Sequence, residues 1–389
     1  MGKTHTVRFE PVGIEMQADE DETILTAAFR QGIMLRHGCK EGQCSACKSF
    51  LLDGEVDLDR YSTFALPDFE LEEGWTLLCR AHALEDLEVE LINFDEEILR
   101  SGMPVQEATA RVDAIEPLTH DIRRLVLSLG EPAELEFHPG QYVDITIPGT
   151  DDGAHRSFSM ANLPSDTGRL EFMIKLYPDG RFSGMLDGGL SPGDELQIKG
   201  PYGVFTLRDQ SPRRLLFIGG GAGMAPNLCL LRSLVERGIE RPAPYYYGAR
   251  SEADLFHRDE LAALEAELPA FTFVPALSEG DWDGESGLIT DGVERLEEDF
   301  KDVDAYVCGP PPMVEAAQAL LMGKGVPESR IYFDKFTTTE SEETSRACRR
   351  IPIGTGCSKP CSRTSTAWST AAATTRIGRW NSSARAAHG

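Results

Sequence analysis

The pattern of hydrophobic and polar positions divides the first part of the chain into short, distinct elements. Residues 4–17 alternate between apolar and polar side chains, which predicts a β-hairpin. The segment 21–33 has the spacing of a short amphipathic helix with an acidic first turn. A cysteine-containing loop follows, and strand-like runs come after it at 48–56 and 87–94. Residues 1–98 therefore predict a small α+β domain wrapped around a metal-binding loop.

The pattern then changes twice. After a connector at 99–106, residues 107–208 contain short strands separated by turn signals, which predicts an antiparallel β-barrel. From 209 to 336, buried strands alternate with helical segments, which predicts a doubly wound parallel sheet.

Residues 337–389 follow neither pattern. They hold 8 Lys and Arg against 3 Asp and Glu and are rich in Ser, Thr, Ala and Arg. Such a composition predicts a disordered tail, and the abrupt change also fits an out-of-frame end. The sequence does not decide between the two.

Charge and cysteine content narrow the function classes. The chain of 389 residues has a net charge of −26, and residues 1–98 carry 22 Asp and Glu against 8 Lys and Arg. That surface repels nucleic acid and anionic lipid and favours a basic protein partner. Apolar runs are too short for a membrane span, and the N-terminus resembles no signal peptide. The nine cysteines are clustered, which indicates metal ligation in a reducing cytoplasm.

The cysteine loop carries the most specific signal. Cys39, Cys44 and Cys47 have the spacing C-x4-C-x2-C, and Cys79, separated from Cys47 by 31 residues, is the candidate for a fourth thiolate. A four-cysteine zinc site normally shows two C-x2-C pairs, and this chain has one there. The complete pattern resembles the plant-type [2Fe–2S] ferredoxins, which implies that these four cysteines bind the cluster and that the domain is a β-grasp.

A flavin motif is indicated within the predicted barrel. Residues 156–159, which are Arg156, Ser157, Phe158 and Ser159, resemble the R-x-Y-S motif of the ferredoxin–NADP reductase superfamily. The resemblance implies that the arginine pairs with the FAD pyrophosphate, the aromatic ring packs on the isoalloxazine and the last serine lies near the flavin N5. Phe158 replaces the usual Tyr, so one hydroxyl contact is lost.

A second segment extends this resemblance. "KLYPDGRFSGML" matches the second flavin segment of the same superfamily, with Lys175, Tyr177, Gly180 and Ser183 as the implied FAD contacts. Gly180 to Ser183 would open a helix whose N–H groups meet the phosphates. Two ordinary barrel strands are the alternative interpretation.

A nicotinamide site is indicated in the predicted parallel sheet. Gly219, Gly221, Gly223 and Pro226 lie between a buried strand and a helix, in the order G-x-G-x-x-P. Glycines at this point let a pyrophosphate approach the backbone at a helix N-terminus, and proline suits the first turn. This variant of the glycine pattern also resembles the reductase superfamily.

Two further motifs concern the nicotinamide and its ribose. "YVCGPPPM" resembles the superfamily's C-G-P-x-x-M motif, which implies that Cys308, with Gly309 and Pro310, lies beside the nicotinamide C4. Arg250 could suit a 2′-phosphate, but the acidic Glu252 and Asp254 follow it. Acidic groups favour a free 2′-hydroxyl, so we expect Glu252 at the ribose and NADH as the donor.

The order ferredoxin, flavin barrel, nicotinamide domain resembles the NADH-dependent reductases of bacterial multicomponent oxygenases. The resemblance is greatest to the reductases of soluble di-iron propane or methane monooxygenases, with the benzoate dioxygenase type second. It implies Ser159 and Cys308 as catalytic residues, electron flow from NADH through FAD and [2Fe–2S], and a hydroxylase partner docking on the acidic ferredoxin face. We expect a monomer when free. An electron carrier with a vestigial reductase half is the alternative of a different class.

Overall fold

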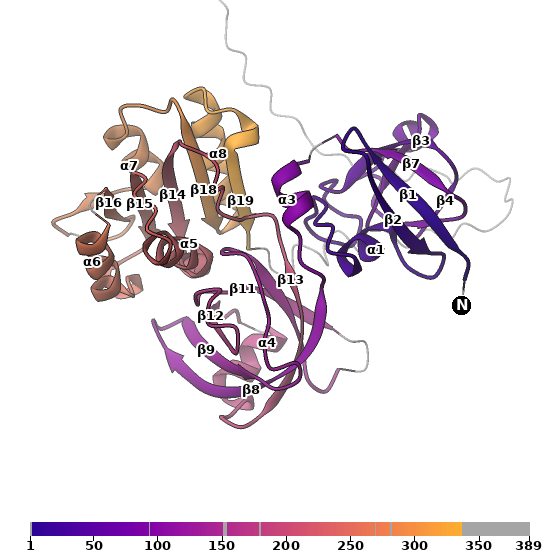
Figure 1. The fold of residues 1–389 in the computed structure, drawn as a ribbon. Coiled ribbons are helices and arrows are strands. Elements are labelled where there is room, and N and C mark those ends of the chain that lie inside the picture. Colours follow the sequence, from indigo (N-terminus) through magenta and orange to yellow (C-terminus); the bar gives the residue numbers. More distant parts are fainter. Residues whose placement is uncertain are drawn as a thin grey trace, which may run out of the picture. The chain divides into compact units, whose positions relative to one another are not determined.

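The computed structural model describes the chain from residue 2 to residue 336 with five short gaps. The described ranges are 2–92, 94–150, 154–178, 180–268, 270–280 and 282–336. The segment predicted as a tail, 337–389, lies outside them. Four sheets organise the described residues, and three of them are large enough to build a domain around (Figure 1).

The N-terminal domain is a five-stranded mixed sheet in the order β2-β1-β7-β3-β5, with a separate β4-β6 ribbon. Strands β1 and β7 are parallel and form the centre of the β-grasp arrangement. The elements are β1 (Thr4–Glu10), β2 (Ile14–Asp19), α1 (Ile24–Arg30), β3 (Lys48–Asp53), β4 (Val56–Leu58), α2 (Asp68–Glu72), β5 (Trp75–Leu77), β6 (Ala81–Ala83) and β7 (Leu87–Glu90).

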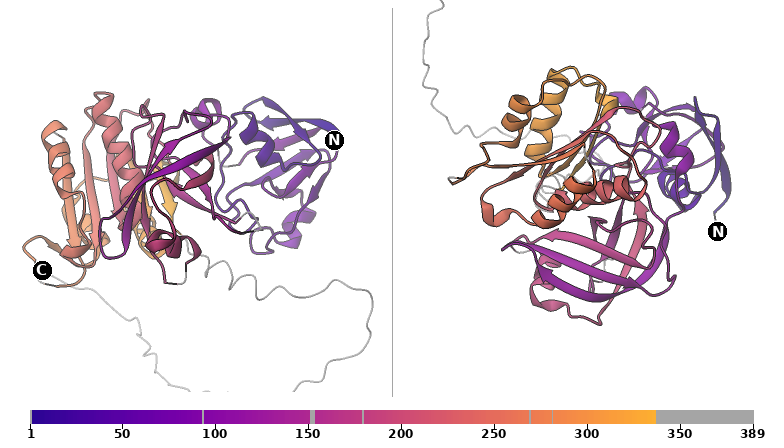
Figure 2. Two further views of the ribbon diagram at one scale, coloured as in Figure 1. Left: turned by 90° about the horizontal axis from the view of Figure 1, so that it is seen from below. Right: turned by 60° about the vertical axis from the view of Figure 1, so that its left-hand side comes forward.

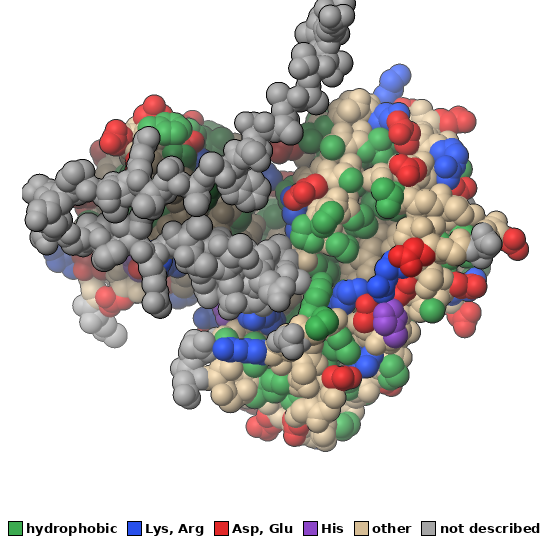
Figure 3. Space-filling model, turned by 180° about the vertical axis from the view of Figure 1, so that it is seen from behind, with side chains coloured by type: hydrophobic (Ala, Val, Ile, Leu, Met, Phe, Trp, Pro, Cys, Tyr) green, Lys and Arg blue, Asp and Glu red, His purple; other side chains and the backbone are tan. Residues whose placement is uncertain are grey.

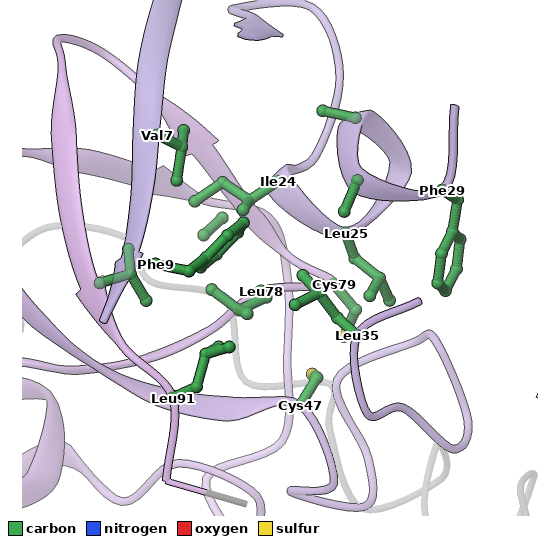
Figure 4. Close-up of a cluster of buried hydrophobic side chains, with 14 of the residues drawn as sticks. Val7, Phe9, Ile24, Leu25, Phe29, Leu35, Cys47, Leu78, Cys79 and Leu91 are labelled. Carbon is green, nitrogen blue, oxygen red and sulfur yellow. The ribbon is translucent and has the colours of Figure 1, made fainter. Parts of the chain in front are cut away.

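Its core contains two of the predicted cluster cysteines. Cys47 and Cys79 are buried and lie among Leu35, Leu78 and their apolar neighbours (Figure 4). Their thiols are therefore held by the packing of the whole domain.

Helix α1 begins later than the sequence pattern predicts. Thr23 caps it, because its Oγ1 accepts a hydrogen bond from the Thr26 N–H at 3.2 Å. Asp21 and Glu22 therefore precede the helix, and the expected acidic first turn was wrong.

A short helix follows the ferredoxin domain. Helix α3 (Glu96–Ser101) is capped by Asp95, whose carboxylate accepts hydrogen bonds from two backbone N–H groups of the first turn. The predicted connector, 99–106, thus contains the end of α3 and Gln106, the first residue of the next strand.

The middle domain is a six-stranded antiparallel sheet in the order β11-β10-β13-β8-β9-β12. A bridge between Met160 and Phe172 joins its two edges, so the barrel is nearly closed. The sequence pattern missed its longest strand, β8. The elements are β8 (Gln106–Pro117), β9 (Ile122–Leu129), β10 (Tyr142–Thr146), β11 (His155–Ser159), β12 (Arg169–Lys175), α4 (Arg181–Gly184), the π-helical turn Met185–Gly189 and β13 (Glu195–Tyr202).

The C-terminal domain is a parallel sheet in the order β17-β16-β15-β14-β18-β19 with helices on both faces (Figure 1, Figure 2). Helices α5 and α6 pack on one core, and α7 and α8 on the other. The elements are β14 (Arg214–Gly220), the 3-10 turn Gly221–Gly223, α5 (Met224–Glu236), β15 (Ala243–Ala249), the 3-10 turn Glu252–Asp254, α6 (Arg258–Glu267), β16 (Phe271–Leu277), β17 (Glu285–Ser286), α7 (Ile289–Leu296), β18 (Val303–Gly309), α8 (Pro311–Gly323), the 3-10 turn Glu328–Arg330 and β19 (Ile331–Lys335).

The three predicted fold classes are therefore confirmed, in the predicted order. Among the described residues no helix combines the length and apolar character needed to cross a membrane. Asp and Glu side chains are spread over the face drawn in Figure 3, with Lys and Arg side chains among them.

Candidate functional site

The cysteine loop lies between α1 and β3, and its backbone folds around the sulfur atoms. The N–H groups of Glu41 and Gln43 point at Cys39 Sγ, at 3.4 and 3.1 Å, and the N–H of Cys39 points at Cys44 Sγ at 3.3 Å. Such donors stabilise thiolates rather than thiols, so the local chain is suited to binding metal through sulfur.

The four thiols form two pairs. Cys39 hydrogen-bonds Cys44, which lowers the pKa of Cys44 to about 6 and raises the pKa of Cys39. Cys79 hydrogen-bonds Cys47, which lowers the pKa of Cys47 and raises the pKa of Cys79. In each pair the hydrogen bond favours the thiolate form of one sulfur and the thiol form of its neighbour.

This pairing distinguishes between the two kinds of metal site that the cysteine spacing raised, a zinc site and a [2Fe–2S] cluster. A single zinc ion, with Zn–S bonds of about 2.3 Å, brings all four sulfurs within about 4 Å of one another. Among the described cysteines, no three sulfurs all lie within 4.8 Å of each other. Two pairs fit a binuclear [2Fe–2S] cluster and do not fit a mononuclear zinc site.

Two glycines make this loop possible. A Cβ on Gly38 would lie 2.9 Å from Cys44 Sγ, so a larger residue would displace the sulfur. Gly42 has φ +70°, and a Cβ there would lie 2.8 Å from the Tyr61 side chain. The glycines are therefore required by close approach to sulfur and by a left-handed turn.

The predicted flavin motif forms strand β11, whose alternation places its side chains on two faces. Ser157 Oγ donates to Asp144 Oδ1 of β10 at 2.6 Å, and Arg156 Nη1 donates to the His155 carbonyl at 2.7 Å. The Phe158 ring packs against Phe182 of α4, with ring centroids 4.9 Å apart. The motif thus lies at the edge of the barrel, between β10 and helix α4.

The second predicted flavin segment turns back towards this strand. The Tyr177 N–H donates to Ser183 Oγ at 2.9 Å, and Gly180 is the residue before α4. A Cβ on Gly180 would lie 2.8 Å from the same hydroxyl, which explains the glycine. Lys175 lies apart from these groups and pairs with Asp121 at 2.8 Å.

The predicted nicotinamide glycines follow β14 and have different local roles. Gly221 has φ +57° and open space where a Cβ would be, so its backbone is accessible. A Cβ on Gly219 would collide with Tyr245, and one on Gly223 with the carbonyl of Cys308. Pro226 lies in the first turn of α5, as predicted. Open backbone and close packing are both present at this helix N-terminus.

A group of three side chains meets where the barrel reaches the parallel sheet. Ser159 Oγ at the end of β11 donates to Asp334 Oδ2 of β19 at 3.3 Å. Asp334 is the register partner of Cys308 in β18, and Cys308 is the register partner of Gly219 in β14. This row lies at the carboxyl end of the parallel strands, where ligands bind in such sheets.

The environment of this group shifts the pKa values of its two titratable residues, Asp334 and Cys308. Burial raises the pKa of Asp334 to about 6, and the Ser159 hydrogen bond partly offsets that rise. Burial, with the nearby Asp334 carboxylate, raises the pKa of the fully buried Cys308 thiol. Cys308 is therefore a neutral thiol at neutral pH, and Asp334 is a carboxyl group that can hold or release a proton near it.

Asp334 was missed by the sequence analysis. It lies in "RIYFDKF", where a single acid directly after the apolar-aromatic run Ile-Tyr-Phe was the available signal. Gly309, with φ +151°, and Pro310 lie after Cys308 and turn the chain into α8.

The residues expected near the ribose are arranged differently from the simple prediction. The Arg250 guanidinium is bonded to Asp254 at 3.1 Å and Asp121 at 3.3 Å. Glu252 instead pairs with Arg258 at 3.0 Å and is well exposed. Of the two acidic residues that follow Arg250 in the chain, it is therefore Asp254, and not Glu252, whose carboxylate pairs with the Arg250 guanidinium.

His120, Asp121 and Asp254 also bring three ligand atoms within 4.8 Å of one another. Arg250 contacts all three residues, and Lys175 contacts Asp121. Because these cations already neutralise the carboxylates, the group is an ion-pair cluster.

Comparison with protein-family models matches all three domains. Residues 7–84 match the 2Fe-2S iron-sulfur cluster binding domain, 109–207 the oxidoreductase FAD-binding domain and 217–319 the oxidoreductase NAD-binding domain. The expected cofactor classes are thereby confirmed.

Individual proteins share this organisation over most of the chain. The chain is 51% identical over 345 residues to the reductase component of propane 2-monooxygenase from Mycolicibacterium goodii, covering 87% of this chain and 99% of that protein. It is 52% identical over 345 residues to the corresponding component from Rhodococcus jostii (strain RHA1), covering 87% and 93%. The crystal structure of the Amycolatopsis cytochrome P450 reductase GcoB is similar with a TM-score of 0.77 and 33% identity, covering 86% of this chain and 99% of that one.

Proposed function

The chain belongs to the family of reductase components that includes those of the propane 2-monooxygenases, and from this we propose that it oxidises NADH and delivers the electrons to a monooxygenase hydroxylase. The route is NADH to FAD to [2Fe–2S] to a di-iron alkane hydroxylase. The reductase of an aromatic-ring dioxygenase is the alternative partner assignment.

The observation that carries this proposal is the position of strand β11 between two neighbours. Ser157 bonds Asp144, which in turn pairs with Lys40 of the cysteine loop at 2.5 Å. Two residues further along, Ser159 bonds Asp334 of the parallel sheet. A flavin held by this strand would have the proposed nicotinamide site and the cysteine loop as neighbours, which is the arrangement that the electron route requires.

Bound FAD would accept two electrons as hydride and release them singly, a conversion that neither nicotinamide nor an iron–sulfur cluster performs alone. Arg156 would pair with its pyrophosphate, while the turn at Gly180 and Ser183, with Tyr177, would hold the flavin segment. Ser157 and Phe158 would orient strand β11 against the barrel. Lys175 would be a further FAD contact, and its ammonium also pairs with Asp121.

At the nicotinamide end, Ser159 and Cys308 are the proposed catalytic residues. Gly219, Gly221, Gly223 and Pro226 would admit the pyrophosphate, with Gly309 and Pro310 shaping the turn after Cys308 and Glu252 near the ribose. Asp334, which accepts the Ser159 hydroxyl, would position that hydroxyl. A neutral Cys308 thiol would exclude water beside the hydride without repelling it electrostatically.

Cys39, Cys44, Cys47 and Cys79 are the proposed cluster ligands. The domain limits that we propose are 1–98, 107–208 and 209–336, with the linker 99–106 and a tail 337–389 that is dispensable. We further propose a cytoplasmic protein that is monomeric when free of its partner.

The surface for the hydroxylase is proposed on the acidic ferredoxin domain, next to the cysteine loop. Ser45 Oγ donates to the Ala65 carbonyl at 2.9 Å, so the segment containing Phe64 is tied to this loop. Phe64, which precedes the acidic helix α2, is 94% exposed, and Phe69, within that helix, is 62% exposed. An apolar side chain with an acidic surround suits a partner surface that has an apolar pocket and a basic rim.

The electron route is tested by anaerobic titration with NADH, followed by visible and EPR spectra. Bleaching of a flavin band and the appearance of a reduced [2Fe–2S] signal are expected from the same sample. Flavin reduction with no cluster signal would contradict the complete route, and no flavin reduction would contradict the function as a whole.

The docking surface is tested by salt and by Phe64→Ser. Electron delivery to the hydroxylase should fall as salt rises, while NADH-driven ferricyanide reduction changes less. Phe64→Ser should raise the hydroxylase concentration needed for half-maximal rate by about fivefold. Leu288→Ser, which removes a side chain 63% exposed in the C-terminal domain, is the matched control. Salt-independent delivery together with an unchanged Phe64→Ser variant would rule out this surface.

A further inference from the structure

Lys40 reaches from the cysteine loop to the barrel. Its Nζ lies 2.5 Å from Asp144 Oδ2 in β10, and the two side chains are 19% and 9% exposed. A hydrogen-bonded pair of opposite charges with little solvent exposure is stronger than the same pair on an open surface. This contact therefore holds the loop against the barrel.

The acceptor of this contact leads directly to the flavin motif. The other oxygen of Asp144 accepts the Ser157 hydroxyl at 2.6 Å, and the two residues face each other in the β10–β11 register. One carboxylate thus joins the residue next to a predicted cluster ligand to the strand that carries Arg156 and Ser159.

The side chain and the backbone of Lys40 are both fitted to this contact with the barrel. Its ammonium lies 3.9 Å from the Tyr202 ring centroid and 5.3 Å from that of Tyr142, both residues of the barrel. Its backbone has φ +55°, a left-handed conformation that non-glycine residues seldom adopt. Tyr202 is also buried in the core of the N-terminal domain, so the two domains share apolar packing at this point.

We propose that Lys40 is a positioning residue that sets the separation of the flavin and the iron–sulfur cluster. The proposal rests on the proposed function. With FAD and the cluster bound, a hydride from NADH would supply two electrons and one proton; the cluster would accept the electrons one at a time, passing the first to the external acceptor before it takes the second, and the proton would go to solvent. Lys40 and Asp144 keep their charges throughout and exchange neither proton nor electron. Because electron transfer weakens steeply with distance, loosening this contact slows the transfer without altering either carrier.

Lys40→Met removes the charge and keeps most of the apolar stem, while Lys40→Arg restores a cation. Asp144→Asn keeps an oxygen acceptor for Ser157 and removes the charge that Lys40 needs. The matched control is Lys48→Met: Lys48 pairs with Glu70 at 2.5 Å and lies 6.0 Å from the Trp75 ring, with all three residues inside the N-terminal domain.

Stopped-flow spectra on FAD- and cluster-loaded protein separate the two electron steps. Cluster reduction should slow at least about tenfold in Lys40→Met and in Asp144→Asn, and recover in Lys40→Arg, with flavin reduction by NADH changed less than about twofold. Lys48→Met should match the wild type in both steps.

A second readout needs no turnover. Amide hydrogen exchange of residues 38–47 and 142–146, measured without NADH, should accelerate by at least about threefold in Lys40→Met and not in Lys48→Met. If Lys40→Met fails to retain the cluster, Asp144→Asn carries the test, because its substitution lies outside the loop.

Wild-type cluster reduction and exchange in Lys40→Met and Asp144→Asn would overturn the proposal, as would equal slowing in Lys48→Met. Failure of NADH to reduce the flavin in the unmodified protein would instead contradict the proposed function, so the two failures are distinguishable.

Discussion

The cysteine loop and the hydride site solve the same problem, bringing reactive groups together, in opposite ways. Three of the four cysteines lie within nine residues, and local N–H groups of the same loop point at two of their sulfurs. Ser159 and Asp334 are 175 residues apart and meet through one hydrogen bond between a barrel strand and the edge of a parallel sheet. The first site is built within one domain, from one short loop and Cys79 of the same core, and the second depends on how two domains pack.

The difference predicts how each site fails. A loop that carries its own donors depends on the identity of a few residues, so a single ligand change removes its function. An assembled site depends on register and contact between strands, so single changes weaken it by degrees.

The largest effect is expected at the loop. Cys44→Ser should abolish the [2Fe–2S] EPR signal, because an alcohol is a far poorer ligand than a thiolate. NADH-dependent flavin reduction should continue, because its residues lie in the other two domains. Cys229→Ser is the control, since the Cys229 thiol is buried and contacts the Asn162 carbonyl at 3.1 Å, away from the loop. A normal signal in Cys44→Ser would remove this residue from the ligand set.

A smaller effect is expected at the assembled site. Ser159→Ala and Cys308→Ala should each slow flavin reduction by at least about tenfold, with weaker effects on NADH binding, because both act at the reacting edge. Stopped-flow absorbance measures both quantities. Ser233→Ala is the matched control, since Ser233 is buried and bonds the Cys229 carbonyl. Rates within about twofold of the wild type, about 0.4 kcal/mol in barrier, would contradict the assignment.

The third prediction concerns the cost of keeping Asp334 in this site. Its pKa is raised from 3.8 to about 6, so between these values the folded protein holds a proton that the unfolded chain has released. The free energy of unfolding should therefore fall as pH rises through this window. Asp334→Asn cannot titrate and should not show this fall. The difference in free energy of unfolding between Asp334→Asn and the wild type should therefore be about 1–3 kcal/mol more favourable to the variant at pH 8 than at pH 4.

Urea unfolding at both pH values measures this difference. Asp254→Asn provides a control of opposite sign: the Ser251 N–H and hydroxyl and the Arg250 guanidinium lower the pKa of Asp254 despite its partial burial. That carboxylate stabilises the fold above its unfolded pKa, and its contribution is lost as pH falls. A difference for Asp334→Asn that is independent of pH would show that this carboxyl is not perturbed.

The smallest effect is expected at the ribose end, which is also assembled from two domains. Asp121→Asn and Asp254→Asn should each remove one of the two carboxylates that pair with Arg250 and raise the use of NADPH relative to NADH by about threefold, because a less neutralised guanidinium attracts a 2′-phosphate more strongly. The ratio of kcat/KM values for the two donors measures this change. Glu315→Gln, which removes an exposed carboxylate paired with Lys335, should leave the ratio unchanged. An unchanged ratio in both aspartate variants would indicate that Arg250 lies away from the ribose.

The sequence by itself determined the order of the three domains, the strand–glycine–helix start of the parallel sheet and the cysteine loop. These features depend on residues close together in the chain: period-2 or alternating β/α patterns, glycines where backbone must approach closely, and thiols spaced for one loop. The long strand β8, helix α7 and the late start of α1 escaped because their patterns are weak or are overridden by a cap such as Thr23.

Tertiary structure alone decided which polar side chains meet. Asp334, Asp144 and Lys40 have no motif, and each is meaningful only through a partner on another strand or in another domain: Ser159, Ser157 and the barrel tyrosines. It also showed that Arg250, a potential phosphate ligand from the sequence, forms ion pairs with Asp121 and Asp254. Local sequence patterns determine secondary structure and close contacts between residues that are near one another in the chain. Contacts between distant segments depend on strand register and domain packing, which no short stretch of sequence contains.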